Sequence, residues 1–346
     1  MNFKFIKVLR SEQWWGHILP PIFLFYFAGI LQSTINDKKH VLFHCIMIAG
    51  LSIITGLGGY FINDLFDIED DKKAKKKNQV AGFPLWLKIS LIPVLTTSAF
   101  IIYSILSSEI SKQEASLYFC TFLLNTFLFI IYSVPPIRLK KSIYLAPVAD
   151  ALYSGTFFYL LAFAIGSKVE LISLKSAVLS FVILFLYSFL KGIRNYLLHL
   201  SDDYQHDIMS GLDTLSTRYD SKIIICIANK IYPVEVLLLL FFILTQNIIS
   251  FSAIIICCIF LLIWLRFARE DLMKKEVHLN DLQEVWLPMC FLIQLIISNT
   301  TLYSLVIIYV ILFPYHLYKV YCLIDFIYYK TIYKLIGPIR KNKKSS

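Results

Sequence analysis

The stretch GLGGYFINDLFDIEDDKKAKKKN, residues 56–78, is the most informative part of the sequence. A run without charged residues, from Val41 to Ile62, ends there in a cluster of carboxylates. Four polar residues of the cluster are spaced so that one face of a continuous helix would present Asn63, Asp64, Asp67 and Asp71. Like charges stacked in this way repel one another unless a cation lies among them. Since hard oxygen ligands suit Mg²⁺ held together with a phosphate, the stretch predicts such a site.

The remaining acidic residues of this stretch have a different expected role. Glu69 and Asp70 fall off the face that starts at Asn63 in a helix, so we expect both to be solvated. The lysines that follow, Lys72 to Lys77, are interpreted mainly as a signal that this end of the helix faces the cytoplasm.

The composition is that of an integral membrane protein. The chain has 346 residues, of which 58% are hydrophobic and 16% charged, and its mean hydropathy is +0.69. Soluble domains carry roughly 25% charged residues. The net charge of +10 comes from lysines and arginines between apolar runs, which indicates loops beside an anionic lipid surface rather than nucleic-acid binding. The seven cysteines show no CxxC spacing and are expected to be core residues.

The apolar runs predict an all-α fold, a polytopic membrane helical bundle. A spanning helix needs about 20 mostly apolar residues. Runs of this kind lie near 14–33, 40–62, 84–106, 115–134, 144–166, 174–197, 221–245 and 249–267, and 285–317 is long enough for two more segments. We therefore expect nine or ten transmembrane segments. The basic loops favour ten, with both chain ends and the acidic site on the cytoplasmic side of a plasma (inner) membrane.

A similar motif to that of the acidic stretch recurs 136 positions further along the chain. The matched pairs are Gly56 with Gly192, Tyr60 with Tyr196, Asp67 with Asp203, and Asp71 with Asp207. The second copy, GIRNYLLHLSDDYQHDIMSG, also ends an apolar run, but His199 and Leu200 replace the Asn-Asp pair of the first copy. Because internal repeats often frame membrane sites, we expect two half-bundles around a central cavity.

This repeat gives the expected domain organisation. Residues 1–13 are a cytoplasmic or interfacial N-terminus, and 14–317 form the transmembrane domain. Its first half covers about 14–143, its second half about 144–284, and extra C-terminal spans about 285–317. Residues 318–346, aromatic and then basic, are expected to be an interfacial or cytoplasmic tail.

Two facing carboxylate clusters can do a definite kind of chemistry. They can hold two or more Mg²⁺ ions, which neutralise a diphosphate and stabilise it as a leaving group. Cationic candidates to assist the departing phosphate are Arg138, Lys140, Lys191 and Arg194. The 21 Tyr and 28 Phe supply aromatic faces that can stabilise an allylic cation. Further polar residues that could face the cavity are His199, Asp202 and Asp150, the last near the start of an apolar span.

These motifs together resemble the UbiA superfamily of intramembrane prenyltransferases, over roughly residues 8–270. The family pattern N-D-x-x-D-x-x-x-D is complete as Asn63, Asp64, Asp67 and Asp71. The segment from Tyr132 to Lys140, YSVPPIRLK, is similar to the family's Y-S-x-x-P-x-R-x-K stretch. The second pattern, D-x-x-x-D followed by G-x-x-T-L, has its counterpart in Asp203, Asp207, Gly211, Thr214 and Leu215.

The resemblance implies Mg²⁺-dependent transfer of a prenyl group from a polyprenyl diphosphate to an acceptor within a helical bundle in a lipid bilayer. It also implies a metal and diphosphate site made of Asn63, Asp64, Asp67, Asp71, Asp203 and Asp207, assisted by Arg138, Lys140 and Tyr132. His199 and Leu200 depart from the family pattern, so the second half of the site is expected to bind metal less fully. We expect no nucleic acid and no obligate protein partner.

Three alternatives remain open at this point. The segment from Leu9 to Trp14, LRSEQW, is similar to the Arg-Pro-x-Gln-Trp entry of members that transfer a phosphoribosyl-type group to a polyprenyl phosphate. A terpene cyclase would ionise the same diphosphate without an acceptor. An ion-coupled transporter is a different class, and it predicts carboxylates near the bilayer midplane beside broken helices. The carboxylates lie instead at helix ends next to lysine-rich loops, which favours an enzyme.

Overall fold

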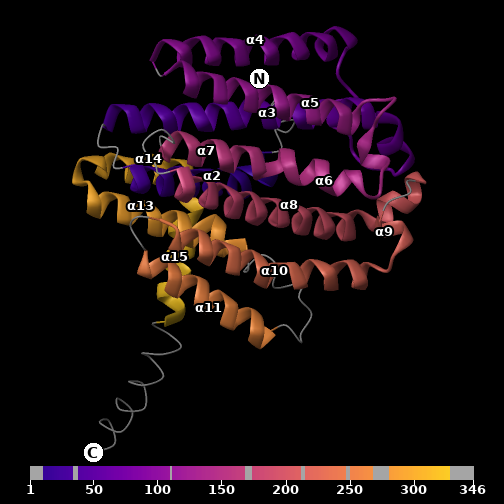
Figure 1. Cartoon of the computed structure of the whole chain (residues 1–346). Coiled ribbons are helices and arrows are strands. Elements are labelled where there is room, and N and C mark those ends of the chain that lie inside the picture. The colour runs from indigo at the N-terminus through magenta and orange to yellow at the C-terminus, as the bar shows by residue number, and fades with distance from the viewer. Residues whose placement is uncertain are drawn as a thin grey trace, which may run out of the picture.

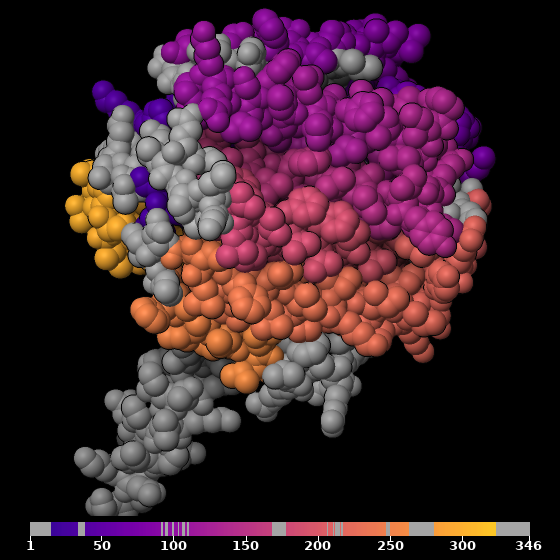
Figure 2. All heavy atoms as spheres, viewed as in Figure 1, coloured from indigo at the N-terminus to yellow at the C-terminus, as the bar shows by residue number. Residues whose placement is uncertain are grey.

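The computed structural model describes residues 11–33, 38–109, 111–167, 174–211, 215–246, 250–267 and 280–327. Within these ranges all regular structure is helical. The long helices lie side by side along a common direction, with α4 at one edge of the bundle and α11 at the opposite edge (Figure 1). In the same view their side chains form a continuous surface (Figure 2).

The helices follow one another in three groups. The first comprises α2 (Ser11–Ser33), α3 (Lys38–Lys73), α4 (Leu85–Glu109) and α5 (Lys112–Ser133), followed by the 3₁₀ turn η1 (Leu139–Lys141). The second comprises α6 (Leu145–Ala151), the π-turn η2 (Leu152–Thr156), α7 (Phe157–Ser167), α8 (Leu174–Ser210), α9 (Leu215–Arg218), α10 (Ser221–Leu244) and α11 (Phe251–Phe267). The third comprises the π-turn η5 (Leu282–Trp286), α13 (Leu287–Ser298), the 3₁₀ turn η6 (Thr300–Tyr303), α14 (Ser304–Leu312) and α15 (Pro314–Ile327).

Several of these helices are suited to a bilayer. Among the described residues, six helices are long and apolar enough to cross a membrane, or seven if the bent pair α14 and α15 is one span. Large apolar side chains such as Phe127 and Phe241 are exposed on the outside of the bundle, where water would be unfavourable and lipid would not. The expected total of nine or ten spans stays a prediction.

The C-terminal part, where two apolar segments are expected within 285–317, contains a sharp bend. The chain bends by 86° between α14 and α15, directly at Phe313. The expected start of the tail at residue 318 falls inside α15, which packs on the bundle through an ion pair of 2.7 Å between Lys319 Nζ and Asp281 Oδ2. Trp15 Nε1 also donates a hydrogen bond of 2.8 Å to the backbone oxygen of Leu312. These two contacts hold the C-terminal helices against the rest of the bundle, beside α2. No local sequence pattern reveals them.

One pair of helix starts follows the offset between the two acidic motifs. Helices α4 and α10 begin at Leu85 and Ser221, which are 136 residues apart. Both α3 and α8 continue well beyond their apolar part and carry the carboxylates on their last turns. The two-half repeat itself stays a prediction.

Helix α2 forms the centre of the bundle. In an apolar stretch of 18 residues of α2, 83% of the residues are buried, whereas in the corresponding stretch of α5 only 22% are buried. It packs closely on α7 where Gly29 meets Gly166, because neither residue has a side chain to keep the two backbones apart. The beginning of α2 lines the cavity described below, through Trp15, Gly16, His17 and Ile18.

Replacing Gly166 with Ala should destabilise the protein by about 1–3 kcal/mol, as overpacking usually does. A Cβ atom at Gly166 would lie 2.4 Å from the backbone oxygen of Tyr26, which cannot move without displacing α2. Thermal unfolding of the protein in lipid nanodiscs measures the effect. Gly56→Ala is the matched control, since a Cβ atom there meets nothing within 4 Å. Equal unfolding temperatures for the two variants would contradict the prediction.

Candidate functional site

The ends of α3 and α8 line a cavity of about 1600 Å³. Its acidic and amide lining at this end comes from both motifs: Asn63, Asp67, Asp70, Asp71, Asp202, Asp203 and Asp207. Each set stands on the last turns of a long helix, and the two sets belong to residues far apart in the sequence. The structure therefore brings both predicted motifs to one cavity.

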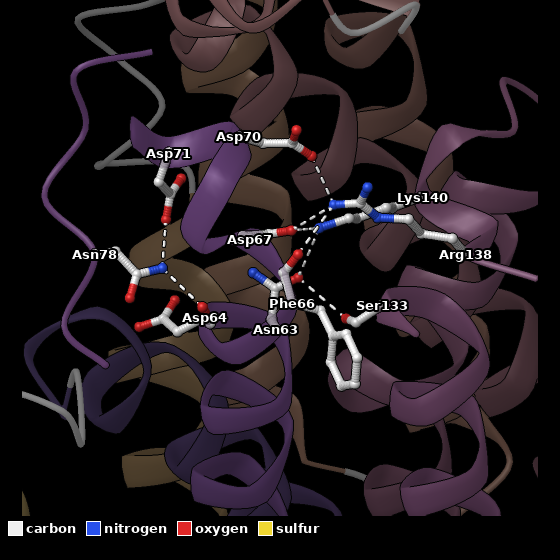
Figure 3. Close-up of polar contacts among 10 residues, drawn as sticks. All are labelled: Asn63, Asp64, Phe66, Asp67, Asp70, Asp71, Asn78, Ser133, Arg138 and Lys140. Carbon is white, nitrogen blue, oxygen red and sulfur yellow. Dashed lines mark hydrogen bonds and ion pairs between the residues drawn. The ribbon is translucent and has the colours of Figure 1, made fainter. Parts of the chain in front are cut away.

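The basic loop after α5 covers the first motif (Figure 3). Arg138 Nη2 lies 3.0 Å from Asp67 Oδ1 and 2.6 Å from Asp70 Oδ2. The Lys140 ammonium is in contact with the same Asp67 oxygen and lies 3.5 Å from Asn63 Oδ1. Ser133 Oγ donates to that amide oxygen at 3.1 Å. Asp67 of helix α3 is thus contacted by two of the three cations of the loop, Arg138 and Lys140.

The backbone of this loop is held in an unusual conformation. Arg138 has a φ of 42°, in the left-handed region that non-glycine residues rarely adopt. Such a conformation persists only where the surroundings hold it, here the contacts of the guanidinium with α3. Burial lowers the pKa of Lys140 to about 8, and the charge of Lys141 adds to this effect while that of Asp64 opposes it. Because burial disfavours the charged ammonium of Lys140, a negatively charged group beside it would stabilise the charge.

Two acidic residues do not lie where the helical pattern predicts. Asp64 is 2% exposed and does not line the cavity. In Figure 3 it lies on the side of α3 next to Asn78, away from Lys140, because one helical residue turns the side chain by about 100° from its neighbour Asn63. Asp70, expected to be solvated, accepts from Arg138 and lines the cavity. Glu69 is exposed, as expected.

Asn78 is a site residue that the sequence pattern does not single out. Its Nδ2 donates to Asp71 Oδ2 at 2.8 Å and to the backbone oxygen of Asp64 at 2.7 Å. Its Oδ1 accepts from the backbone amides of Val80 and Ala81, both at 2.9 Å. This network ties the loop after α3 back to the last turns of the helix and orients the carboxylate of Asp71.

The second motif is tied to the first half by a lysine. Lys76 Nζ lies 3.5 Å from Asp203 Oδ1, and His199 Nε2 lies 3.4 Å from Asp203 Oδ2. Lys76 belongs to the lysine run expected mainly to mark topology, yet it lines the cavity. The His199 side chain is 74% exposed, while Leu200 is buried against Tyr196. Thr214 of the predicted second pattern lies outside the described residues.

Lys191 and Arg194, predicted to assist the diphosphate, are separated from the carboxylates. Arg194 is 2% exposed, does not line the cavity, and pairs with Glu235 at 2.7 Å (Nε to Oε1) and with Asn280 Oδ1 at 2.7 Å. Its place on the α10 side of α8 explains this, and the predicted role of Arg194 in binding the diphosphate stays a prediction. Lys191 lines the cavity, but it precedes Asp203 by twelve residues of α8, about 18 Å of helical rise.

Three aromatic side chains also line the cavity, those of Phe129, Tyr132 and Tyr153. Tyr153 donates to Asp150 Oδ1 at 2.6 Å, and its ring centroid lies 5.3 Å from that of Tyr132 and 4.2 Å from that of Phe129. The π-helical turn η2 carries Tyr153 and begins at Leu152, two residues after Asp150. All four residues line the cavity, so two predicted candidates, Asp150 and Tyr132, are brought together there.

The inner part of the cavity holds three polar residues that sequence reasoning missed, His17, Tyr159 and Glu284, beside the predicted Lys191. His17 Nδ1 lies 2.7 Å from Glu284 Oε2, and Lys191 Nζ donates to the Tyr159 hydroxyl at 2.9 Å. His17 comes from the beginning of α2 and Glu284 from the π-turn η5, 267 residues later. A carboxylate at the start of an apolar run is the sequence signal that could have marked Glu284.

Comparison with known proteins defines the fold. No family model and no curated protein matches the sequence. A UbiA homolog from Archaeoglobus fulgidus bound to DMAPP and Mg²⁺ has a similar structure, with a TM-score of 0.57 and 16% identity over 83% of this chain and 98% of that chain. The same homolog bound to GPP and Mg²⁺ gives 0.57 and 16% over 83% and 99%. Its Cd²⁺-bound structure gives 0.54 and 15% over 83% and 99%. The chain therefore has the UbiA-like fold, and this fold and the six apolar helices among the described residues indicate an integral membrane protein.

Proposed function

We propose that the chain is a member of the UbiA superfamily and a prenyltransferase. It would transfer the prenyl group of a prenyl diphosphate to an acceptor and release diphosphate. The observation that carries this proposal is the pair of carboxylate sets on α3 and α8 that line one cavity, with Arg138 and Lys140 against the first set. The similar structures of a UbiA homolog, bound to DMAPP or GPP and Mg²⁺, support it.

The side chains present fit Mg²⁺. Carboxylate and amide oxygens are the hard ligands that this ion prefers, and it commonly binds through one or two carboxylates together with substrate phosphates. Asn63, Asp67 and Asp71 would hold one ion from α3, and Asp203 and Asp207 another from α8. When bound, Mg²⁺ neutralises the diphosphate and so makes it a better leaving group.

The protein's own groups would then have distinct tasks. Arg138 and Lys140, which contact Asp67, would turn to the phosphate oxygens and compensate the negative charge that develops on departure. The faces of Tyr153, Tyr132 and Phe129 line the cavity next to the carboxylates and would stabilise positive charge on the allyl group. The acceptor would approach from the inner part of the cavity, where Lys191 and the pair of His17 with Glu284 offer polar contacts.

The orientation of the site is also part of the proposal. Lys72 and Lys73 lie in the last turn of α3, directly after its carboxylates, and Arg138 and Lys140 contact Asp67 on the same part of the helix. Because cytoplasmic loops carry an excess of Lys and Arg, the mouth of the site would face the cytoplasm, with nine or ten spans in a plasma (inner) membrane. Substrate would reach this mouth with its diphosphate in water and its apolar tail among the helices.

Replacing Asp203 with Asn should lower Mg²⁺-dependent diphosphate release by about 10- to 100-fold, the equivalent of one charge-assisted contact. Proteoliposomes with labelled geranyl diphosphate and Mg²⁺, with and without fractionated cell metabolites, provide the measurement, and mass spectrometry identifies the labelled product. Glu69→Gln, an exposed carboxylate at the end of α3 that does not line the cavity, is the control and should keep full activity.

The same experiment separates the alternatives. A labelled cyclic hydrocarbon formed without added metabolites would identify a cyclase. Product formation that needs a phosphorylated sugar and a polyprenyl phosphate would identify phosphoribosyl-type transfer. Ion flux without any prenyl substrate, together with full activity of Asp203→Asn, would reject the prenyltransferase.

A further inference from the structure

A second cluster of metal-ligating side chains lies at the opposite end of α3. His40 and His44 stand on the first turns of this helix and Glu114 on the first turn of α5, and one ligand atom of each lies within 4.8 Å of the others. His44 and Asp67 are separated by 23 residues of α3, about 35 Å of helical rise. The cluster is therefore independent of the acidic site and of the function proposed for it.

The local structure explains why these three side chains meet. Residues four apart on a helix share a face, and the rings of His40 and His44 have centroids 4.4 Å apart. Helix α5 packs on α3 and begins with a capping box. In this box Glu114 Oε2 accepts from the backbone amide of Ser111 at 3.1 Å and from its hydroxyl at 2.9 Å. Both bonds use one oxygen, so Oε1 remains available and the carboxylate is held in place.

A buried nitrogen atom without a hydrogen bond is a second reason to expect a bound cation in this cluster. His44 is 0% exposed. The Nε2 atom of His40 is buried and has no hydrogen-bond partner. A buried polar atom left unsatisfied is destabilising and uncommon in native proteins. An ion bound between the two imidazoles and Glu114 would satisfy this nitrogen and would balance the carboxylate charge at the same time.

We propose that His40, His44 and Glu114 bind one late divalent transition-metal ion, Zn²⁺ being the ion that suits two imidazoles and a carboxylate in a four-coordinate site. A water molecule would complete the coordination. The ion would join the beginnings of α3 and α5 and stabilise their packing. Because imidazole ligands disfavour Mg²⁺, the two ends of α3 would select different metals.

The test uses full-length protein without a histidine tag, in lipid nanodiscs, treated with a chelator and then kept in excess Mg²⁺ to occupy the carboxylates at the other end of α3. Equilibrium dialysis with Zn²⁺ should give one ion per chain. Co²⁺ should bind at the same site with a visible absorption spectrum, which Zn²⁺ abolishes. X-ray absorption of the wild-type zinc form should show imidazole ligands, a readout that needs no variant.

His40→Gln and Glu114→Gln should each weaken Zn²⁺ binding by more than about 100-fold, since even partners outside the coordination sphere are worth about 10- to 100-fold. Both variants should also lose the rise in unfolding temperature that Zn²⁺ produces in the wild type. The double variant Asp67→Asn/Asp203→Asn is the matched control and should keep the zinc site. Absence of zinc binding by the wild type, or its loss only in the aspartate double variant, would overturn the proposal.

Discussion

Asp67→Asn should reduce Mg²⁺-dependent diphosphate release by about 100- to 1,000-fold, the range seen when a single group that stabilises a transition state is removed. Asp67 is the residue of the first motif that both Arg138 and Lys140 contact. Removing its charge would take away one ligand of the proposed Mg²⁺ and the carboxylate that Lys140 contacts, while Arg138 would keep its pair with Asp70. Release of labelled diphosphate from prenyl diphosphate in proteoliposomes measures the effect.

Asp64→Asn is the control that makes this result specific. Asp64 belongs to the same sequence motif, but it is buried and does not line the cavity. We expect it to keep activity within about tenfold of the wild type, while thermal unfolding shows whether its burial matters for stability. Equal losses of activity in the two variants would contradict the division of the motif into cavity-lining and buried residues.

Arg194→Met should destabilise the protein by about 3–5 kcal/mol, because it leaves the buried carboxylate of Glu235 without its partner. The two side chains are 3% and 2% exposed, and Arg194 Nε lies 2.7 Å from Glu235 Oε1. The effect is therefore on folding rather than on the diphosphate. Thermal unfolding in nanodiscs measures it, and KM for the prenyl diphosphate, determined on the folded fraction, should remain close to that of the wild type.

The double variant Arg194→Met/Glu235→Leu completes this comparison. Replacing both members of a buried ion pair by apolar residues of similar size is often neutral or stabilising, so most of the lost stability should return. A large rise in KM for Arg194→Met with an unchanged unfolding temperature would instead support the role in diphosphate binding that the sequence predicts.

The parts of the site that local patterns describe could be predicted. The change from apolar to acidic residues at Ile62 and Asn63 places carboxylates at a helix end, and the similar motif 136 residues later places a second set at the end of a second long helix. Arg138 and Lys140, in the basic loop after α5, contact Asp67 of the first set. The position of this loop directly after a predicted span is consistent with that contact. These predictions depend on hydropathy, charge and spacing, which are properties of neighbouring residues.

The parts that could not be predicted depend on which side of a helix faces which neighbour. Asp70, expected to be solvated, lines the cavity, whereas Asp64, expected on the cavity face, is buried away from it. The loop of Arg138 covers one side of α3 and Asn78 contacts the other. The cationic Arg194 belongs to a buried pair with Glu235, which lies 41 residues away in the sequence. No local pattern indicates these partners, since they are chosen by how helices pack.

The sequence by itself determined that this protein is a bundle of apolar helices with two acidic helix ends, because burial of apolar surface in a membrane and repulsion between carboxylates depend on composition and spacing alone. Tertiary structure decided the rest. Packing of α3, α8 and the loop after α5 determines which carboxylates line the cavity, and the return of the C-terminal segment brings Glu284 to His17. Contacts between residues so distant in the chain form only when the helices pack together.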